Sequence, residues 1–142
     1  MLNALIALAA LATPQAGENL IVNGDFTSEE GWTRRVHEGT STHALADQGF
    51  DLTPSVVIRA PREGSASYFQ KVKVEPYSTY RLSAMVGTNN LVSLGGKGAF
   101  IGVTEFPEDG SRALSGTVVW TRLESVFRTR GYTEVTVELT GG

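Results

Sequence analysis

The fold is decided by the stretch YFQKVKVEPYSTYRLSAMV, residues 68–86. In its first half Val72 and Val74 alternate with two lysines, which is the two-residue period of a β-strand with one buried face. Residues 75–78, EPYS, form a turn sequence because proline fixes φ there. The second half alternates again around Leu82. Since lysines are costly to bury, the stretch predicts a hairpin that buries its valine-bearing and leucine-bearing side.

The alternation also assigns faces in the later strands. We expect Arg81, Ser83 and Met85 to point together into solvent from the second strand of the hairpin. The inward-facing positions of that strand and of the last strand are expected to be Tyr80, Leu82, Ala84, Val86, Val135, Val137 and Leu139. Strands with one buried and one solvated face are typical of antiparallel sheets.

The remaining chain is a series of short runs rich in Val, Ile, Thr, Tyr and Phe, separated by Gly, Pro, Asn and Asp clusters. This spacing predicts an all-β protein, an antiparallel β-sandwich. Residues 37–54 carry no strong pattern and are expected to form a loop. The strands are expected at residues 19–23, 32–36, 55–60, 67–74, 79–88, 97–106, 120–129 and 133–139.

The first sixteen residues, MLNALIALAALATPQA, contain no charged side chain. Their apolar run is shorter than the roughly 20 residues that span a bilayer, and it ends in small residues with Ala16 as a cleavage residue. We expect a signal peptide at 1–16 and one β-sandwich domain at 17–142. The alternative is a buried helix. Secretion without cysteine is expected of a bacterial-type envelope or extracellular protein.

Composition excludes several classes of function. The chain has 142 residues, 41% hydrophobic and 19% charged, which is typical of one globular domain. A net charge of -3 without a basic block argues against nucleic-acid binding. The absence of cysteine excludes disulfides, thiolate metal sites and cysteine nucleophiles.

Three segments carry a family resemblance. The opening NLIVNGDFTSEEGW, the hairpin described above and the strand WTRLESVFRT at 120–129 resemble carbohydrate-binding modules of the galactose-binding-domain-like superfamily, nearest to families four, nine and twenty-two. The resemblance implies a jelly-roll sandwich that binds a polysaccharide or glycan. It also implies a neighbouring hydrolase or peptidase domain in the same parent protein.

The sequence departs from that family at three places. Thr27 stands where a glutamate often helps to bind a structural Ca²⁺, and Met85 stands where a tryptophan is frequent on the ligand-facing strand. The chain stops at Gly142 without the family's last strand, so we expect a fragment, a truncated product or a domain completed by another chain. Where the resemblance implies calcium, the ligands would be Asp25 and Thr27.

A sugar site needs an aromatic surface with polar groups beside it. We expect the ligand at Arg59, Phe69, Arg81, Ser83 and Met85; the alternative is a solvated sheet face without a ligand. For Trp32 we favour a core role over stacking on a ligand, and Trp120 is expected to pack under a loop.

Catalysis is not expected. The sequence has no G-x-S-x-G elbow, no carboxylate pair in a catalytic context, and a Gly-rich segment at 95–98 that lacks the spacing of a phosphate loop. We expect a secreted, non-catalytic carbohydrate-binding module. The alternatives are a structural or protein-interaction jelly roll without sugar binding, and a small polysaccharide-active enzyme.

Overall fold

The protein is an antiparallel β-sandwich, seen here in a computed structural model that describes residues 2–12, 20–46, 54–60, 64–92 and 98–142. One sheet has five strands, in the spatial order β3 (Thr42–Ala46), β4 (Ser55–Ala60), β1 (Leu2–Ala12), β6 (Thr79–Leu91) and β8 (Gly116–Arg128). The other has four, in the order β2 (Thr33–Glu38), β5 (Ser65–Lys73), β9 (Glu134–Gly141) and β7 (Phe100–Val103). A short 3-10 turn, η2 (Pro107–Asp109), follows β7.

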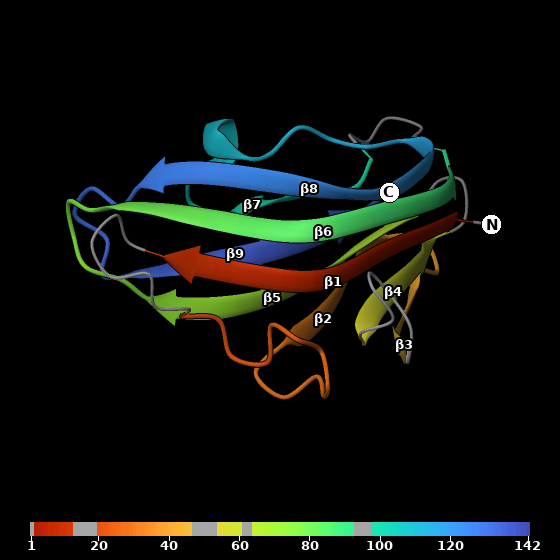
Figure 1. The fold of residues 1–142 in the computed structure, drawn as a ribbon, viewed down its shortest axis with the longest axis horizontal. Helices are drawn as coiled ribbons and strands as arrows, with labels where there is room; N and C mark the ends of the chain where they lie inside the picture. Colours follow the sequence, from red (N-terminus) through yellow and green to blue (C-terminus); the bar gives the residue numbers. More distant parts are fainter. Residues whose placement is uncertain (1, 13–19, 47–53, 61–63, 93–97) are drawn as a thin grey trace.

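Every pair of neighbouring strands is antiparallel, and the two sheets lie face to face (Figure 1). The predicted fold class, an all-β antiparallel sandwich, is confirmed. In Figure 1 the long strand β6 runs between β1 and β8, while β5, β9 and β7 lie behind them. Among the residues that the structure describes, no helix is long and apolar enough to cross a membrane.

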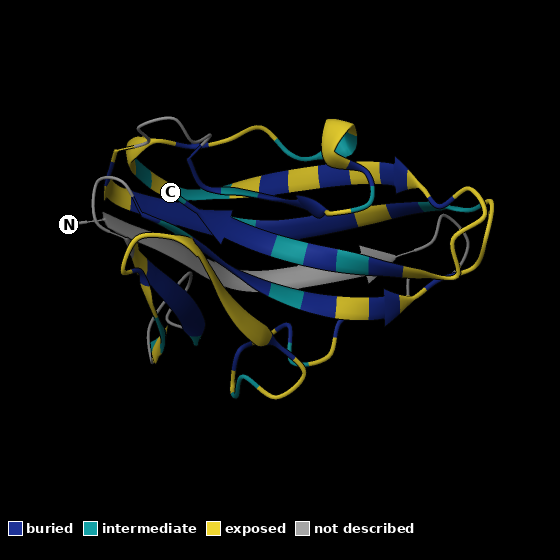
Figure 2. Cartoon of the chain, turned by 180° about the vertical axis from the view of Figure 1, so that it is seen from behind, coloured by how far each residue is buried: buried dark blue, intermediate teal, exposed yellow. Residues whose placement is uncertain are grey.

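The core between the sheets is the one that the alternation predicted. Leu82 and Val137 are fully buried, and Val72 and Val74 are 4% and 9% exposed. At one end the rings of Tyr80 and Phe106 both stack with Phe127, with centroids 6.0 and 5.9 Å from it. Figure 2 shows buried residues interrupted by intermediate or exposed ones along β5 and β9, whereas β2 is exposed throughout. All seven predicted inward positions of β6 and β9 are buried.

The strand expected at residues 19–23 is wrong, because turns occupy residues 22–25. Asn23 and Phe26 adopt left-handed φ values of 52° and 54°, which a continuous strand does not allow. The Phe26 amide closes one turn by donating to the Asn23 carbonyl at 3.1 Å. The chain therefore caps the sandwich at this point instead of adding a strand.

The loop expected at residues 37–54 is also wrong in part. β2 continues to Glu38, and β3 forms in the middle of the segment. β3 pairs with β4 from Thr42 opposite Arg59 to Ala46 opposite Ser55. Its sequence, THALA, carries little alternation, so pairing with β4, rather than local pattern, makes it a strand.

β1 covers most of the segment in which a signal peptide is expected. It pairs with β4 through Leu2–Ile6 and with β6 through Asn3–Ala12, which makes it the middle strand of the five-stranded sheet. The alternative of a buried helix is therefore wrong for these residues. Cleavage after Ala16 stays a prediction, since the fold describes the chain with residues 2–12 in place.

Candidate functional site

The predicted ligand-binding residues divide between the two sheets. Arg81, Ser83 and Met85 occupy alternate positions of β6, and Arg59 lies on β4 of the same sheet. Phe69 belongs to β5 of the other sheet. The structure therefore brings three of the five together, places Arg59 two strands away from them, and puts Phe69 on the opposite face of the sandwich.

The three β6 residues meet polar side chains of β8. Ser83 lies opposite Glu124 in the strand register, and Met85 lies opposite Arg122. Arg122 donates from Nε to Glu124 Oε1 at 2.9 Å and from Nη2 to Ser83 Oγ at 3.3 Å. Arg81 Nε lies 3.8 Å from Glu124 Oε2. A connected row of alternating charge therefore crosses this pair of strands.

Two properties of that row follow from its contacts. Ser83 was expected to be exposed, which is wrong: it is 7% exposed, and its hydroxyl oxygen accepts a hydrogen bond from Arg122. The hydrogen bond from Arg122, followed by the charges of Arg122 and Arg81, lowers the pKa of the Glu124 carboxyl. Glu124 is therefore an ionised acceptor between two cations at neutral pH.

Trp120 supplies an aromatic surface beside this row. A Cβ atom on Gly87 would lie 3.4 Å from Trp120 Cδ2 and 3.5 Å from Trp120 Cε3, so the indole lies against the backbone of β6. Gly87 follows the buried Val86 and hence faces outward, on the same side as Met85. The indole is partly exposed. From the sequence, an aromatic side chain was expected at position 85, and Trp120 was expected under a loop.

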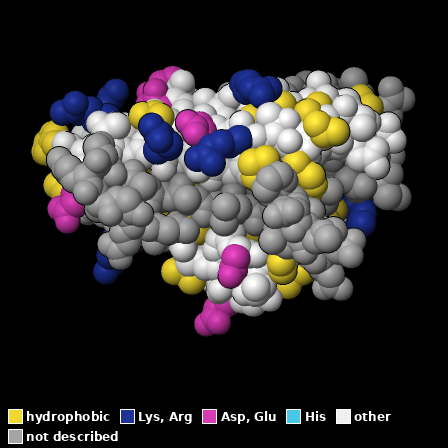
Figure 3. All heavy atoms as spheres, in the orientation of Figure 1, with side chains coloured by type: hydrophobic (Ala, Val, Ile, Leu, Met, Phe, Trp, Pro, Cys, Tyr) yellow, Lys and Arg dark blue, Asp and Glu magenta, His cyan; other side chains and the backbone are white. Residues whose placement is uncertain are grey.

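The position of Trp120 over Gly87 follows from the register of β6 and β8. Val86 pairs with Thr121, but Thr88 pairs with Val118, so β8 bulges and two of its residues face the single Gly87. This bulge turns the indole over the glycine. Figure 3 views the same face: basic and acidic side chains gather over β6 and β8, with hydrophobic ones beside them.

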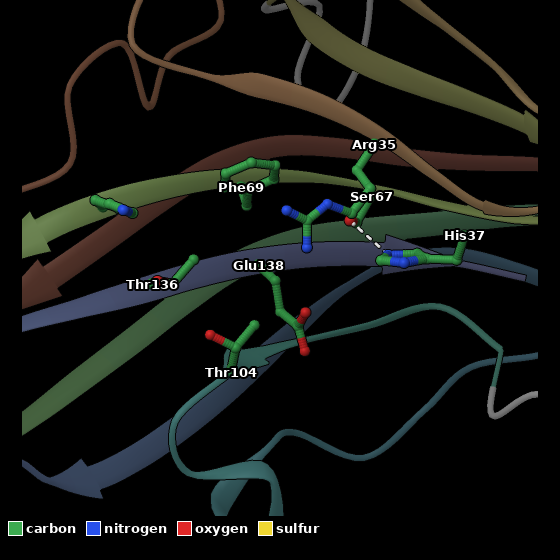
Figure 4. Close-up of a pocket in the computed structure, with 8 residues that line it drawn as sticks. Arg35, His37, Ser67, Phe69, Thr104, Thr136 and Glu138 are labelled. Carbon is green, nitrogen blue, oxygen red and sulfur yellow. Dashed lines mark hydrogen bonds between the residues drawn. The ribbon is translucent and has the colours of Figure 1, made fainter.

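Phe69 lies in a different setting on the four-stranded sheet. It lines a hollow of about 170 Å³ together with seven other residues, shown in Figure 4: Arg35, His37, Ser67, Lys71, Thr104, Thr136 and Glu138. The Arg35 guanidinium lies over the Phe69 ring, 4.6 Å from its centroid. This face of the ring is therefore covered by a cation and does not offer an open platform to a sugar.

The predicted calcium ligands lie together in an exposed turn. Asp25 Oδ1 accepts from both the backbone N–H and the hydroxyl of Thr27, each at 3.2 Å. Within the described parts of the chain, no group of three or more His, Asp or Glu side chains could hold a metal ion. Calcium binding by Asp25 and Thr27 stays a prediction.

Trp32 has the core role that we favoured. It is 8% exposed, and its ring packs against Phe26 with centroids 5.4 Å apart. Its Nε1 donates to the Asn23 carbonyl at 3.0 Å, which satisfies the indole N–H inside the fold. Trp32 therefore stabilises the cap formed by residues 20–32.

No protein-family model matches the sequence, and the search of curated proteins finds no match.

Proposed function

We propose that the protein is a non-catalytic carbohydrate-binding module, similar to galactose-binding-domain-like modules, with its glycan platform on β6 and β8. The platform consists of Trp120, Met85, Arg81, Arg122 and Glu124. The observation that carries this proposal is the indole of Trp120 lying against Gly87, beside a connected row of charged side chains.

The aromatic part of the platform suits the apolar face of a sugar ring. A pyranose stacks on a flat π-surface, and the backbone at Gly87 supports the indole from beneath. Met85, two positions earlier on the same strand, extends the apolar area with a side chain that adapts to irregular shapes. The two residues together offer a surface for one or two sugar rings.

The polar part of the platform suits sugar hydroxyls. Arg81 and Arg122 present N–H donors, and Glu124 presents carboxylate acceptors, so a hydroxyl can donate and accept at the same time. Arg122 is held by Glu124 and Ser83 before any ligand arrives. Because this side chain is already ordered, binding costs less conformational entropy.

Three further parts of the proposal, namely localisation, a neighbouring domain and calcium, rest on the sequence. The uncharged apolar segment at 1–16 supports a secreted or envelope protein, although its cleavage as a leader would remove β1 from the sandwich. The family resemblance supports a neighbouring hydrolase or peptidase domain. The same resemblance supports a structural Ca²⁺ at Asp25 and Thr27.

Affinity electrophoresis in gels that contain neutral polysaccharides tests the platform. Wild-type protein should be retarded by at least one of them, and Trp120→Ala should lose about tenfold or more in affinity because the stacking surface is gone. Phe69→Ala is the matched control on the opposite face and should bind as wild type does. Retardation of Trp120→Ala equal to wild type, or no retardation of wild type by any polysaccharide, contradicts the proposal.

A second candidate function is a protein-interaction domain. β8 is an edge strand of its sheet, and Val119 and Val126 on it are 84% and 51% exposed. An edge strand with apolar side chains can pair with another chain. Sedimentation analysis that shows concentration-dependent association, together with no polysaccharide binding, would favour this function. Turnover of a polysaccharide would instead show an enzyme.

A further inference from the structure

We propose that the hollow on the outer face of the four-stranded sheet is a second binding site, which takes a hydroxylated carboxylate such as a sugar acid. The site is separate from the glycan platform, which lies on the other sheet. We refer to it as the sugar-acid hollow and define it by the eight lining residues given above.

The dimensions of the hollow limit the ligand. Residues of β2, β5 and β9, and Thr104 just after β7, all contribute to it, so it crosses the whole sheet. Its volume of about 170 Å³ lies below the roughly 300–1,000 Å³ of pockets for drug-sized molecules. A single small group, such as one sugar residue, is the appropriate size.

One side of the hollow is cationic. Arg35 on β2 and Lys71 on β5 flank Phe69. The ring holds the Arg35 guanidinium 4.6 Å from its centroid, which restricts the guanidinium before a ligand binds. Neither cation takes part in the ion pairs found among the described residues. A guanidinium fork held in this way fits a carboxylate, to which it can donate two parallel hydrogen bonds.

The other side of the hollow offers acceptors. Thr104 donates its hydroxyl proton to Glu105 Oε1 at 3.2 Å, and Thr136 donates its own to Glu105 Oε2 at 3.0 Å. Both hydroxyl oxygens therefore remain as acceptors. Glu138 also lines this part of the hollow, and Figure 4 shows it beside Thr104. Acceptors in this arrangement select ligand hydroxyl groups, which donate.

At neutral pH, His37 adds no charge to the cationic side or the acceptor side of the hollow. Its Nε2 lies 2.8 Å from Ser67 Oγ. Burial, and then the charges of Arg35 and His43, lower the pKa of His37. With His37 neutral, the lining carries the positive charges of Arg35 and Lys71 and the negative charge of Glu138. Glu105, which accepts from both threonine hydroxyls, adds a second negative charge, so the charges of the site balance. A balanced site fits a monoanionic carboxylate at Arg35 better than a dianionic phosphate.

The ligand chemistry is thus a carboxylate at one end and hydroxyl groups at the other. Two sources share it: a free sugar acid, and a uronic acid residue within a glycan. Amide chemical shifts of the full chain, followed by NMR during titration with sodium D-galacturonate and separately with polygalacturonate, distinguish these sources. We expect shifts at β5 and β9 with at least one of the two, and no shift with either overturns the proposal.

D-Galactose is the matched neutral probe, because it has the same ring without the carboxylate. It should bind at the hollow at least tenfold more weakly than galacturonate. Equal binding of the two at β5 and β9 overturns the proposal, since the cations would then contribute nothing.

A pair of matched variants assigns the binding to Arg35. Arg35→Gln should weaken galacturonate binding at least tenfold, whereas Arg128→Gln, at an exposed position of β8 on the other sheet, should leave it unchanged. Thr104→Val should weaken it several-fold by removing one acceptor, which serves as a second variant if Arg35→Gln does not fold. Equal affinities of the Arg35 and Arg128 variants overturn the proposal. Trp120→Ala should not affect this site, so failure of the glycan platform is recognised separately.

Discussion

The side-chain amide of Gln70 binds both backbone polar groups of Val22. The Val22 N–H donates to Gln70 Oε1 at 2.8 Å, and Gln70 Nε2 donates to the Val22 carbonyl at 2.9 Å. Gln70 is 5% exposed on the inner side of β5. One buried side-chain amide therefore makes the two hydrogen bonds that a neighbouring strand would otherwise make with Val22. These bonds attach the cap of residues 20–32 to the sheet.

Replacing Gln70 with leucine should lower the free energy of unfolding by about 1–3 kcal/mol, because two hydrogen bonds are lost and the polar groups of Val22 lose their partner. Urea unfolding measures this change. Lys73→Gln, at an exposed position of the same strand, is the control and should stay within about 0.5 kcal/mol of wild type. Equal stability of the two variants would show that the cap does not depend on Gln70.

The size of the side chain at residue 87 should control the position of Trp120. Alanine fits, because its Cβ would meet the indole and the Val118 carbonyl at ordinary contact distances of 3.4–3.5 Å. The larger valine should displace the indole. We expect Gly87→Val to change the tryptophan fluorescence and to lose polysaccharide binding, while Gly87→Ala retains both. If Gly87→Val bound polysaccharide as wild type does, the indole would not contribute to the site.

Stability should fall as the pH drops below about 6.5. Burial lowers the pKa of His37 from 6.5, so the unfolded chain takes up a proton at a higher pH than the folded chain. The free energy of unfolding is therefore highest above 6.5 and decreases until the folded His37 also titrates. Urea unfolding between pH 7.5 and 5.0 measures this decrease.

In His37→Gln the free energy of unfolding should change less with pH between 7.5 and 5.0 than in wild type. The hydrogen bond from Arg34 lowers the pKa of Glu29 from 4.5, so the stabilisation from this pair is lost only below about 4.5 and does not interfere. An unchanged slope in His37→Gln between pH 7.5 and 5.0 would assign the effect to other groups.

Removal of residues 1–16 should destabilise the sandwich strongly. β4 and β6 would both lose the strand that pairs with them, which exposes two rows of backbone polar groups. We expect a chain of residues 17–142 to melt at a lower temperature or to associate, as measured by calorimetry and sedimentation. Equal melting temperatures for this chain and the full chain would contradict the prediction.

Leu5→Pro in the full chain is a more conservative variant. Leu5 pairs with Val57 of β4 and with Gly87 of β6, and proline removes a ladder hydrogen bond from the middle of the sheet. Leu5→Ala is its control, since alanine keeps the backbone donor. The proline variant should be the less stable of the two.

Local sequence patterns were sufficient for much of the fold. The Val- and Ile-rich run before Pro61 predicted β4 at its observed bounds, and alternation predicted the core positions of β6. Neither pattern could predict β3, whose strand conformation comes from pairing with β4. The run at residues 19–23 wrongly predicted a strand, because left-handed residues turn the chain there.

The candidate site was harder to predict. Alternation shows which side chains of one strand share a face, but it does not show which sheet the strand joins, so Phe69 was grouped with residues of the other sheet. Trp120 was missed because its position depends on a bulge between β6 and β8. Bulges arise from strand register, which a local pattern does not contain.

The place of β1 in the middle of its sheet has a consequence for synthesis. Residues 2–12 leave the ribosome well before one of their two partners, β6, which begins only at Thr79. Until then an apolar, uncharged segment has no β6 edge to pair with, and contacts between residues so distant in sequence form slowly. The nascent protein should therefore depend on chaperones that shield residues 2–12 until β6 emerges.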